Sequence, residues 1–263
     1  MDITMVKSDP DYIRINEICG YIAHIVYEHI DLLDKVCLLL QSITKATNSI
    51  TREVEEFFLY VKCDVLENDL EAFHLLKNEF INYYELIQSF EFDSELRVHN
   101  DKEYKIYKLT DNTEKIKVFR GVMFEHIVSA FVKPRYVCYS YETGCQVKIN
   151  GQLVKISYGK GNERHKVTID IAGWNPEDEC GEFYECKIHP FNFKEENLQY
   201  LMHLHSILME HAAYLEVGLV TADTTENAIS KIHEMNINIA DKIKCIGHEK
   251  LKELKTFAFP ISA

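Results

Sequence analysis

The stretch that decides the fold is KVTIDIAGWNPEDECGEFYECKIHP, residues 166–190. Two apolar segments with the side-chain alternation of β-strands flank the polar turn WNPEDECG, residues 174–181. Asp170 lies toward the end of the first segment, and Glu185 and Lys187 lie in the second. Because strand side chains repeat every second residue, Glu185 and Lys187 share one face. If the strands pair through the turn, the carboxylates of Asp170 and Glu185 converge on one cation.

Two carboxylates beside a lysine are suited to phosphate chemistry with a divalent metal. Hard ions such as Mg²⁺ usually take one or two carboxylates together with substrate phosphate and waters. We therefore expect Mg²⁺, with Mn²⁺ as a substitute, held by Asp170, Glu185 and the backbone carbonyl of Cys186. Lys187 is then placed to orient or help deprotonate the attacking water and to stabilise charge in the transition state.

This order of an acid, a loop and a Glu-x-Lys triplet resembles the core of the PD-(D/E)XK nuclease superfamily, which has the restriction-endonuclease-like fold. That family often places a glutamate in Gly-x-x-Phe-Glu on a helix before the sheet, and RGVMFEHIV (120–128) supplies Glu125. The resemblance covers about residues 117–235. It implies a nuclease in which Glu125 completes the ion shell.

The sequence departs from the family pattern at two positions. Ile169, not proline, precedes Asp170. Many members have Gln-x-x-x-Tyr on the following helix, and here Gln199 is followed by His203 at the tyrosine position. The resemblance implies that Gln199 is an active-site polar group and leaves the tyrosine role open to His203.

Charge is distributed unevenly along the 263 residues, whose formal net charge is −13. Residues 1–116 carry 12 Lys and Arg against 23 Asp and Glu, whereas residues 117–263 carry 17 against 19. The excess of acidic residues therefore lies in residues 1–116. In the second half, a local basic surface beside a few acids suits a protein that handles phosphates. The candidates for contacts with a nucleic-acid backbone are Lys133, Arg135, Lys148, Lys155 and Lys160.

The N-terminal region, from Pro10 to about Phe92, has few helix breakers and no strand-like alternation. A 3,4 spacing of apolar residues between Ile15 and Ile43 is typical of a coiled-coil-like seam. A second apolar pattern follows, with one slip in register near Val65. We expect two helices of roughly 45–60 Å that pair as a hairpin and form a homo-oligomer or bind a partner subunit.

Helices and strands are mixed after this region. Helical patterns at 118–132, 195–215 and 225–236 alternate with strand patterns, and Asn150-Gly151 predicts a hairpin turn within 146–159. The expected class is α/β (α+β), a restriction-endonuclease-like mixed-sheet core flanked by helices and preceded by an all-α long helical hairpin. The expected domains are residues 1–96 for the hairpin, 97–116 for a linker and 117–263 for the nuclease domain.

Several classes of protein are disfavoured by the sequence. No run of eighteen apolar residues is present, and the N-terminus lacks the regions of a signal peptide, so we expect a cytoplasmic protein with no membrane partner. The eight cysteines lack a Cys-x-x-Cys pair, which favours reduced thiols over zinc. Trp174 packs over the end of the sheet or, as a sharper alternative, stacks on a base.

The sequence predicts a Mg²⁺-dependent nuclease that hydrolyses phosphodiester bonds, with DNA favoured over RNA by family analogy alone. The family resemblance also implies an effector subunit of a bacterial or phage-defence complex. Two alternatives stay open. One is a stand-alone type II restriction enzyme, and the other is a non-catalytic scaffold that retains a nuclease fold.

Overall fold

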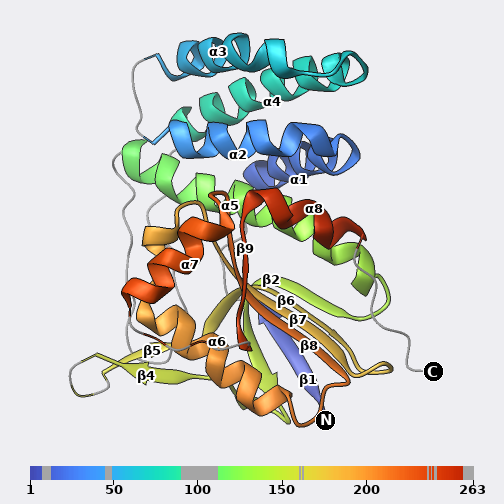
Figure 1. The fold of residues 1–263 in the computed structure, drawn as a ribbon, viewed down its shortest axis with the longest axis vertical. Coiled ribbons are helices and arrows are strands. Elements are labelled where there is room, and N and C mark those ends of the chain that lie inside the picture. The colour runs from blue at the N-terminus through green and yellow to red at the C-terminus, as the bar shows by residue number, and fades with distance from the viewer. Residues whose placement is uncertain are drawn as a thin grey trace. The chain divides into compact units, whose positions relative to one another are not determined.

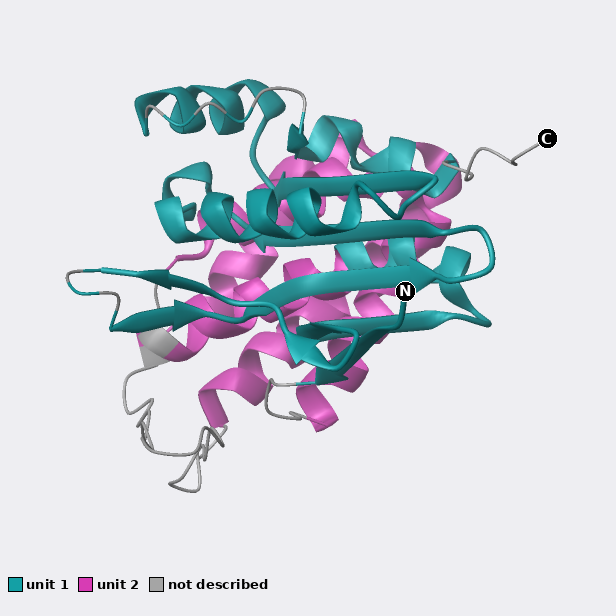
Figure 2. Ribbon diagram, turned by 90° about the horizontal axis from the view of Figure 1, so that it is seen from below, with its two compact units in different colours: residues 1–9, 128–263 teal, residues 10–127 magenta. Residues whose placement is uncertain are grey.

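The computed structural model describes residues 1–7, 13–44, 49–89, 112–159, 161, 163–235, 237, 239 and 242–256. The chain divides into two compact units, which Figure 2 colours separately. Unit 1 comprises Met1–Asp9 and Val128–Ala263, and unit 2 comprises Pro10–Ile127. This division differs from the predicted domains, because the first residues join unit 1 and the unit boundary lies inside a helix. Most of the predicted linker, residues 97–111, lies outside the described residues.

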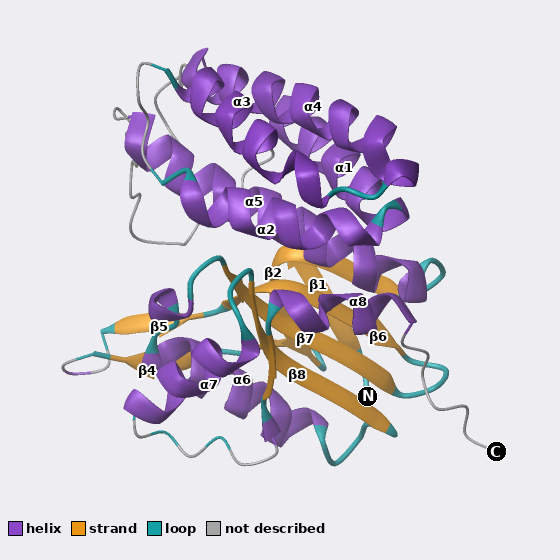
Figure 3. Ribbon diagram, turned by 45° about the horizontal axis from the view of Figure 1, so that its top comes forward, coloured by secondary structure: helices purple, strands orange, loops and turns teal. Residues whose placement is uncertain are grey.

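Unit 1 is built on a mixed sheet (Figures 1 and 3). Its seven strands, within the described residues, are β1 (Ile3–Lys7), β2 (Ser140–Ile149), β3 (Gln152–Leu153), β6 (Thr168–Asn175), β7 (Cys180–Lys187), β8 (Tyr214–Thr221) and β9 (Lys244–Ile246). The order is β1-β2-β6-β7-β8-β9, with β3 paired to β2. Neighbours from β1 to β7 are antiparallel, whereas β7, β8 and β9 run parallel. The predicted mixed α/β class is confirmed.

The hairpin between β2 and β3 turns where the sequence predicts it. Asn150 and Gly151 both have positive φ, 51° and 78°. Glycine and asparagine tolerate this conformation, which two-residue hairpins require. A separate hairpin follows, made of β4 (Ile156–Tyr158) and β5 (Arg164–Lys166).

Helices α6 (Glu195–Leu208) and α7 (Thr225–Glu234) cover one face of this sheet (Figure 3). Apolar side chains of both helices join those of the strands in one core, including Phe183, Leu201 and Ile232. The side chain of Thr224 accepts a hydrogen bond from the backbone N–H of Asn227 and so caps the start of α7. The remaining short elements are η4 (Lys133–Tyr136), η6 (Pro190–Asn192) and α8 (His248–Thr256).

Strand β1 is an element that the sequence interpretation missed. Residues 3–7 pair antiparallel with β2, from Ile3 opposite Ile149 to Lys7 opposite Cys145. The Ile3 side chain is 4% exposed and belongs to the core of unit 1. The segment has too few residues for its alternation to stand out beside a long helical pattern, and its pairing with β2 and the burial of Ile3 stabilise it as β-structure.

Unit 2 contains shorter helices than predicted. They are α1 (Ile13–Glu28), α2 (Leu33–Ser42), α3 (Ile50–Val61), α4 (Leu70–Ser89) and the first part of α5 (Asn112–Val132), with short 3₁₀ segments η1 (Ile30–Leu32), η2 (Lys62–Asp64) and η3 (Glu67–Asp69). The prediction of two long continuous helices is therefore wrong. The breaks coincide with two irregularities of the pattern, His29 within the first seam and the slip near Val65.

Different local features accompany the two breaks. The His29 ring lies 2.7 Å from a carboxylate oxygen of Asp69, a pairing that joins the end of α1 to the start of α4. At the second break, Val65 and Leu66 adopt extended backbone conformations. Buried aromatic side chains fill the space between α3 and α4, with Phe58 and Phe73 ring centroids 5.1 Å apart.

Among the described helices, none is long and apolar enough to cross a membrane.

A buried ion pair lies on the face of the sheet opposite α6. The Arg135 guanidinium binds Glu182 through two bonds of 2.6 and 2.7 Å, and the Glu182 side chain is fully buried. Arg135 also donates to the backbone carbonyls of Phe131 and Leu254. These partners and a side chain only 9% exposed give Arg135 a structural role, and its predicted contact with a nucleic-acid backbone stays a prediction.

The Tyr184 hydroxyl links this ion pair to a second carboxylate. It lies 2.7 Å from a Glu182 oxygen and 2.6 Å from a Glu216 oxygen. Burial alone would raise the pKa of Glu216, but hydrogen bonds from Tyr184, Lys244 and Tyr214 hold that pKa below its ordinary value. The network therefore keeps a charged carboxylate inside the unit.

We predict that Arg135→Ala lowers the free energy of unfolding by about 3–5 kcal/mol, because it leaves Glu182 charged, buried and uncompensated. Lys133→Ala, two residues away and exposed, is the matched control and should change it by less than about 0.5 kcal/mol. Urea denaturation of both variants measures the difference. Equal stability of the two variants would contradict a structural role for Arg135.

Candidate functional site

The register of β6 and β7 brings Asp170 and Glu185 to the same region of one face. Ala172 lies opposite Phe183, on the face covered by α6. Stepping two residues along each antiparallel strand from this pair leads to Asp170 and Glu185. A carboxylate oxygen of Asp170 accepts a 2.7 Å hydrogen bond from the backbone N–H of Cys186, which fixes that side chain against β7.

The Lys187 ammonium group lies among three oxygen atoms. Its Nζ is 2.9 Å from Asp170 Oδ2, 2.9 Å from Glu185 Oε1 and 2.8 Å from the backbone carbonyl oxygen of Cys186. The sequence predicted these four residues as one site, and the structure brings them together. Three oxygens that converge on one positive charge form a cation-binding environment.

Two further residues contact Glu185, and the sequence interpretation missed both roles. Lys166 Nζ at the end of β5 lies 3.0 Å from Glu185 Oε2, and Asn197 Nδ2 in the first turn of α6 donates to Glu185 Oε1 at 2.6 Å. The Glu185 side chain is only 3% exposed, so these contacts offset its loss of hydration. Two sequence signals could have pointed to these contacts. Lys166 comes two residues before β6, which carries Asp170, and Asn197 is the third residue of α6.

Lys166 is itself held in place by α6. Its ammonium group lies 5.7 Å from the ring centroid of Tyr200, within the range of a cation–π contact. Burial, followed by the charges of Cys145 and Glu185, raises the pKa of Tyr200 above its ordinary value, so this phenol stays neutral. The two lysines and the two carboxylates together form a neutral cluster.

The donor set fits a hard divalent cation. Asp170 and Glu185 supply carboxylate oxygens and Cys186 supplies a carbonyl oxygen, which are the ligands that Mg²⁺ accepts alongside waters and substrate phosphate. The described residues contain no group of three or more His, Cys, Asp or Glu side chains that could hold a metal. Two carboxylates and one carbonyl would leave the other positions around Mg²⁺ to water and substrate.

Gln199 and Glu125 are two other predicted site residues. Gln199 is exposed on α6 and donates to Glu195 at 2.7 Å, so the structure does not bring it to the cluster. Asn197, two residues earlier, faces Glu185 in its place. Glu125 belongs to the part of α5 in unit 2, where its charge adds to the effect of burial in raising the pKa of Cys19. Its part in an ion shell stays a prediction.

The remaining basic candidates occupy different positions in unit 1. Lys133 in η4 and Lys155 before β4 are exposed, and Lys148 is half-buried in β2 opposite Thr4. Lys160 lies outside the described residues. Their predicted contacts with nucleic acid stay predictions.

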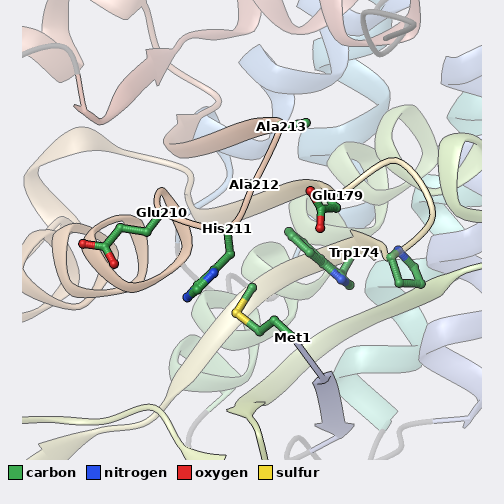
Figure 4. A pocket seen from close by; sticks show the side chains of 8 residues that line it. Met1, Trp174, Glu179, Glu210, His211, Ala212 and Ala213 are labelled. Carbon is green, nitrogen blue, oxygen red and sulfur yellow. The ribbon is translucent and has the colours of Figure 1, made fainter.

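Trp174 lies at the other end of the β6–β7 pair, away from Lys187. Its side chain is 3% exposed, and a Cβ placed on Gly181 would lie 2.7 Å from its ring. The glycine thus provides the space in which the indole packs over the strands, which supports the packing interpretation. The ring also lines a pocket of about 320 Å³ with Glu179, Glu210 and His211 (Figure 4).

Comparisons with known proteins do not assign a family. No family model matches the chain, and no curated protein matches it in sequence. Solved structures with some likeness include protein VC1899 from Vibrio cholerae, with 14% identity and a TM-score of 0.43, covering 97% of this chain and 57% of that one. Another is Can2 from Sulfobacillus thermosulfidooxidans in complex with cyclic tetra-adenylate, with 10% identity and a TM-score of 0.36, covering 96% and 56%.

This chain thus spans little more than half the length of either protein. At these identities and TM-scores, neither likeness assigns an activity to it.

We predict that Lys187→Ala lowers the free energy of unfolding by about 1–3 kcal/mol in EDTA, because two neighbouring carboxylates lose their shared donor. Mg²⁺ should restore part of this loss and stabilise the variant more than the parent. Lys166→Ala is the matched control, since Lys166 contacts Glu185 without contacting Asp170 among the described residues. Urea denaturation with and without Mg²⁺ gives the comparison, and an equal Mg²⁺ effect on all three proteins would count against a cation site.

Proposed function

We propose that this protein is a Mg²⁺-dependent nuclease that hydrolyses phosphodiester bonds in DNA. The observation that carries the proposal is the convergence of Asp170 Oδ2, Glu185 Oε1 and the Cys186 carbonyl oxygen on the Lys187 ammonium. A site with two carboxylates, a carbonyl and a lysine matches the needs of a reaction in which negative charge grows on phosphate oxygens. Mn²⁺ is the expected substitute ion.

Asp170, Glu185 and the carbonyl of Cys186 are the residues that would hold the ion. When bound, the ion would supply charge neutralisation at the scissile phosphate and a lowered pKa for water. Asp170 is oriented by the backbone N–H of Cys186, and Glu185 by Asn197. These bonds fix the two carboxylates before substrate arrives, which limits the reorganisation that binding requires.

The role proposed for Lys187 follows from its position and exposure. Its side chain is 27% exposed, so the ammonium group can reach a substrate phosphate while remaining beside the carboxylates. There it would donate hydrogen bonds to the attacking water and to a phosphate oxygen as negative charge develops. Lys166 is 13% exposed and would mainly balance the charge of Glu185.

The proposal also covers the substrate and the oligomeric state of the protein. DNA is preferred to RNA on family resemblance, and Lys133, Lys148, Lys155 and Lys160 stay candidates for backbone contacts. Because a duplex needs two cuts, we propose a homo-oligomer formed through the helices of unit 2. The acidity of the N-terminal half disfavours strong intrinsic DNA binding, which fits an effector subunit that a protein partner activates in a defence complex.

A non-catalytic scaffold is the second candidate, and one observation favours it. Lys166 and Lys187 already balance both carboxylates in a neutral cluster, so the fold does not need a metal to bury Glu185. A scaffold that retained the site for stability alone would show the same contacts. Cleavage assays separate the two candidates.

We predict that the purified protein cleaves plasmid or linear DNA in Mg²⁺ or Mn²⁺ and not in EDTA. Asp170→Asn and Lys187→Ala should each lower the cleavage rate by roughly 10²–10⁴-fold, since each removes a group that acts on the reacting atoms. Gln199→Ala is the matched control and should cut at the parental rate, because Gln199 is exposed and bonded to Glu195.

The three polymers to compare are duplex DNA, single-stranded DNA and RNA, each with the same ions. Cleavage by Lys187→Ala at the parental rate would remove the proposed mechanism. No cleavage of any polymer by the folded parent in Mg²⁺ or Mn²⁺ would favour the scaffold.

A further inference from the structure

A pocket of about 290 Å³ opens beside the candidate site in unit 1. It lies between the β4–β5 hairpin and the start of α6, and Lys187 and Lys166 both line it. The cluster of Asp170 and Glu185 therefore borders the pocket through these two lysines. Asn197, which donates to Glu185, also lines it.

Two other charged residues line the pocket. They are Lys194, the residue before α6, and Glu196 of α6, and the lining also includes His165 of β5. Lys166 and Lys187 contact the carboxylates of the cluster, whereas Lys194 is a lysine of the lining that does not. Lys194 is exposed, and no acid pairs with it in the part of the chain that the structure describes.

Neutral hydrogen-bonding groups complete the lining. The side chains of Asn192, Asn197, Thr168 and Tyr158 all contribute to it. Such groups and lysines are the usual partners of phosphate oxygens in nucleic-acid complexes. The volume lies at the lower end of the roughly 300–1,000 Å³ found for small-ligand pockets, which suits one phosphate and its sugar and excludes a duplex.

We infer that this pocket binds a backbone phosphate of the substrate strand, next to the phosphate that is cleaved. The inference rests on the proposed function for the identity of the strand. Lys194 provides the charge that holds the flanking phosphate, and the Asn192 amide and the hydroxyls of Thr168 and Tyr158 provide its orientation. Binding here would place the neighbouring phosphate against Lys187, on the border between the pocket and the carboxylates.

The test measures binding of a short fluorescein-labelled DNA oligonucleotide by anisotropy in EDTA, where no cleavage occurs, across a series of salt concentrations. Lys194→Ala should weaken binding by roughly tenfold, as expected for one charge-assisted contact. It should also lower the slope of log affinity against log salt by about one. Lys194→Arg should retain binding.

Lys252→Ala is the matched control, because Lys252 is an exposed lysine of α8 outside this lining and should leave both quantities unchanged. Circular dichroism of each variant confirms folding. Parental affinity and salt slope in Lys194→Ala would overturn the inference, while cleavage by the parent in Mg²⁺ would still support the proposed function. Weakened binding in Lys194→Ala with no cleavage by the parent would support the pocket and count against the nuclease.

Discussion

The antiparallel pairing of β6 with β7 is the constraint on which the candidate site depends. Its register, with Ala172 opposite Phe183, sets which side chains meet on the face beneath α6. A shift by one residue would turn Asp170 or Glu185 to the other face, because side chains alternate along a strand. The core residues of the same face, packed against α6, hold this register and so hold the two carboxylates together.

Each face of the sheet in unit 1 carries a buried carboxylate of β7, and the two are compensated in different ways. On one face Glu182 is held by Arg135 through two hydrogen bonds and is fully buried. On the other face Glu185 is held by two lysines and an amide, one of the lysines being 27% exposed. A bidentate, enclosed pair suits structure, whereas a partly exposed ammonium shared between carboxylates can exchange partners with an ion or a substrate.

The sequence predicted much of unit 1 because its signals there are local. Strand alternation and the Glu-x-Lys spacing placed Asp170, Glu185 and Lys187 together, and Asn150-Gly151 predicted a turn that only such residues adopt easily. Longer-range features escaped prediction. Strand β1 exists through its pairing with β2, from Ile3 opposite Ile149 to Lys7 opposite Cys145, and periodicity within five residues does not reveal so distant a partner.

The same limit explains why the partners of individual side chains were not predicted. Arg135 appears in the sequence as one more basic residue, and only the fold shows that Glu182 occupies its donors. Gln199 and Asn197 lie two residues apart on one helix, and a family pattern selected the first although helix geometry turns the second toward Glu185. In unit 2, the apolar spacing predicted helices correctly but not their interruption at His29, which a contact with Asp69 accompanies.

The account therefore depends on a cation exchanging into the oxygens that now surround the Lys187 ammonium. Anomalous diffraction from crystals soaked in Mn²⁺ tests this directly, because it locates the ion without any assay of activity. The account predicts a manganese peak in contact with the carboxylates of both Asp170 and Glu185. A peak elsewhere, or none with Lys187 still bonded to both carboxylates at saturating Mn²⁺, would contradict it.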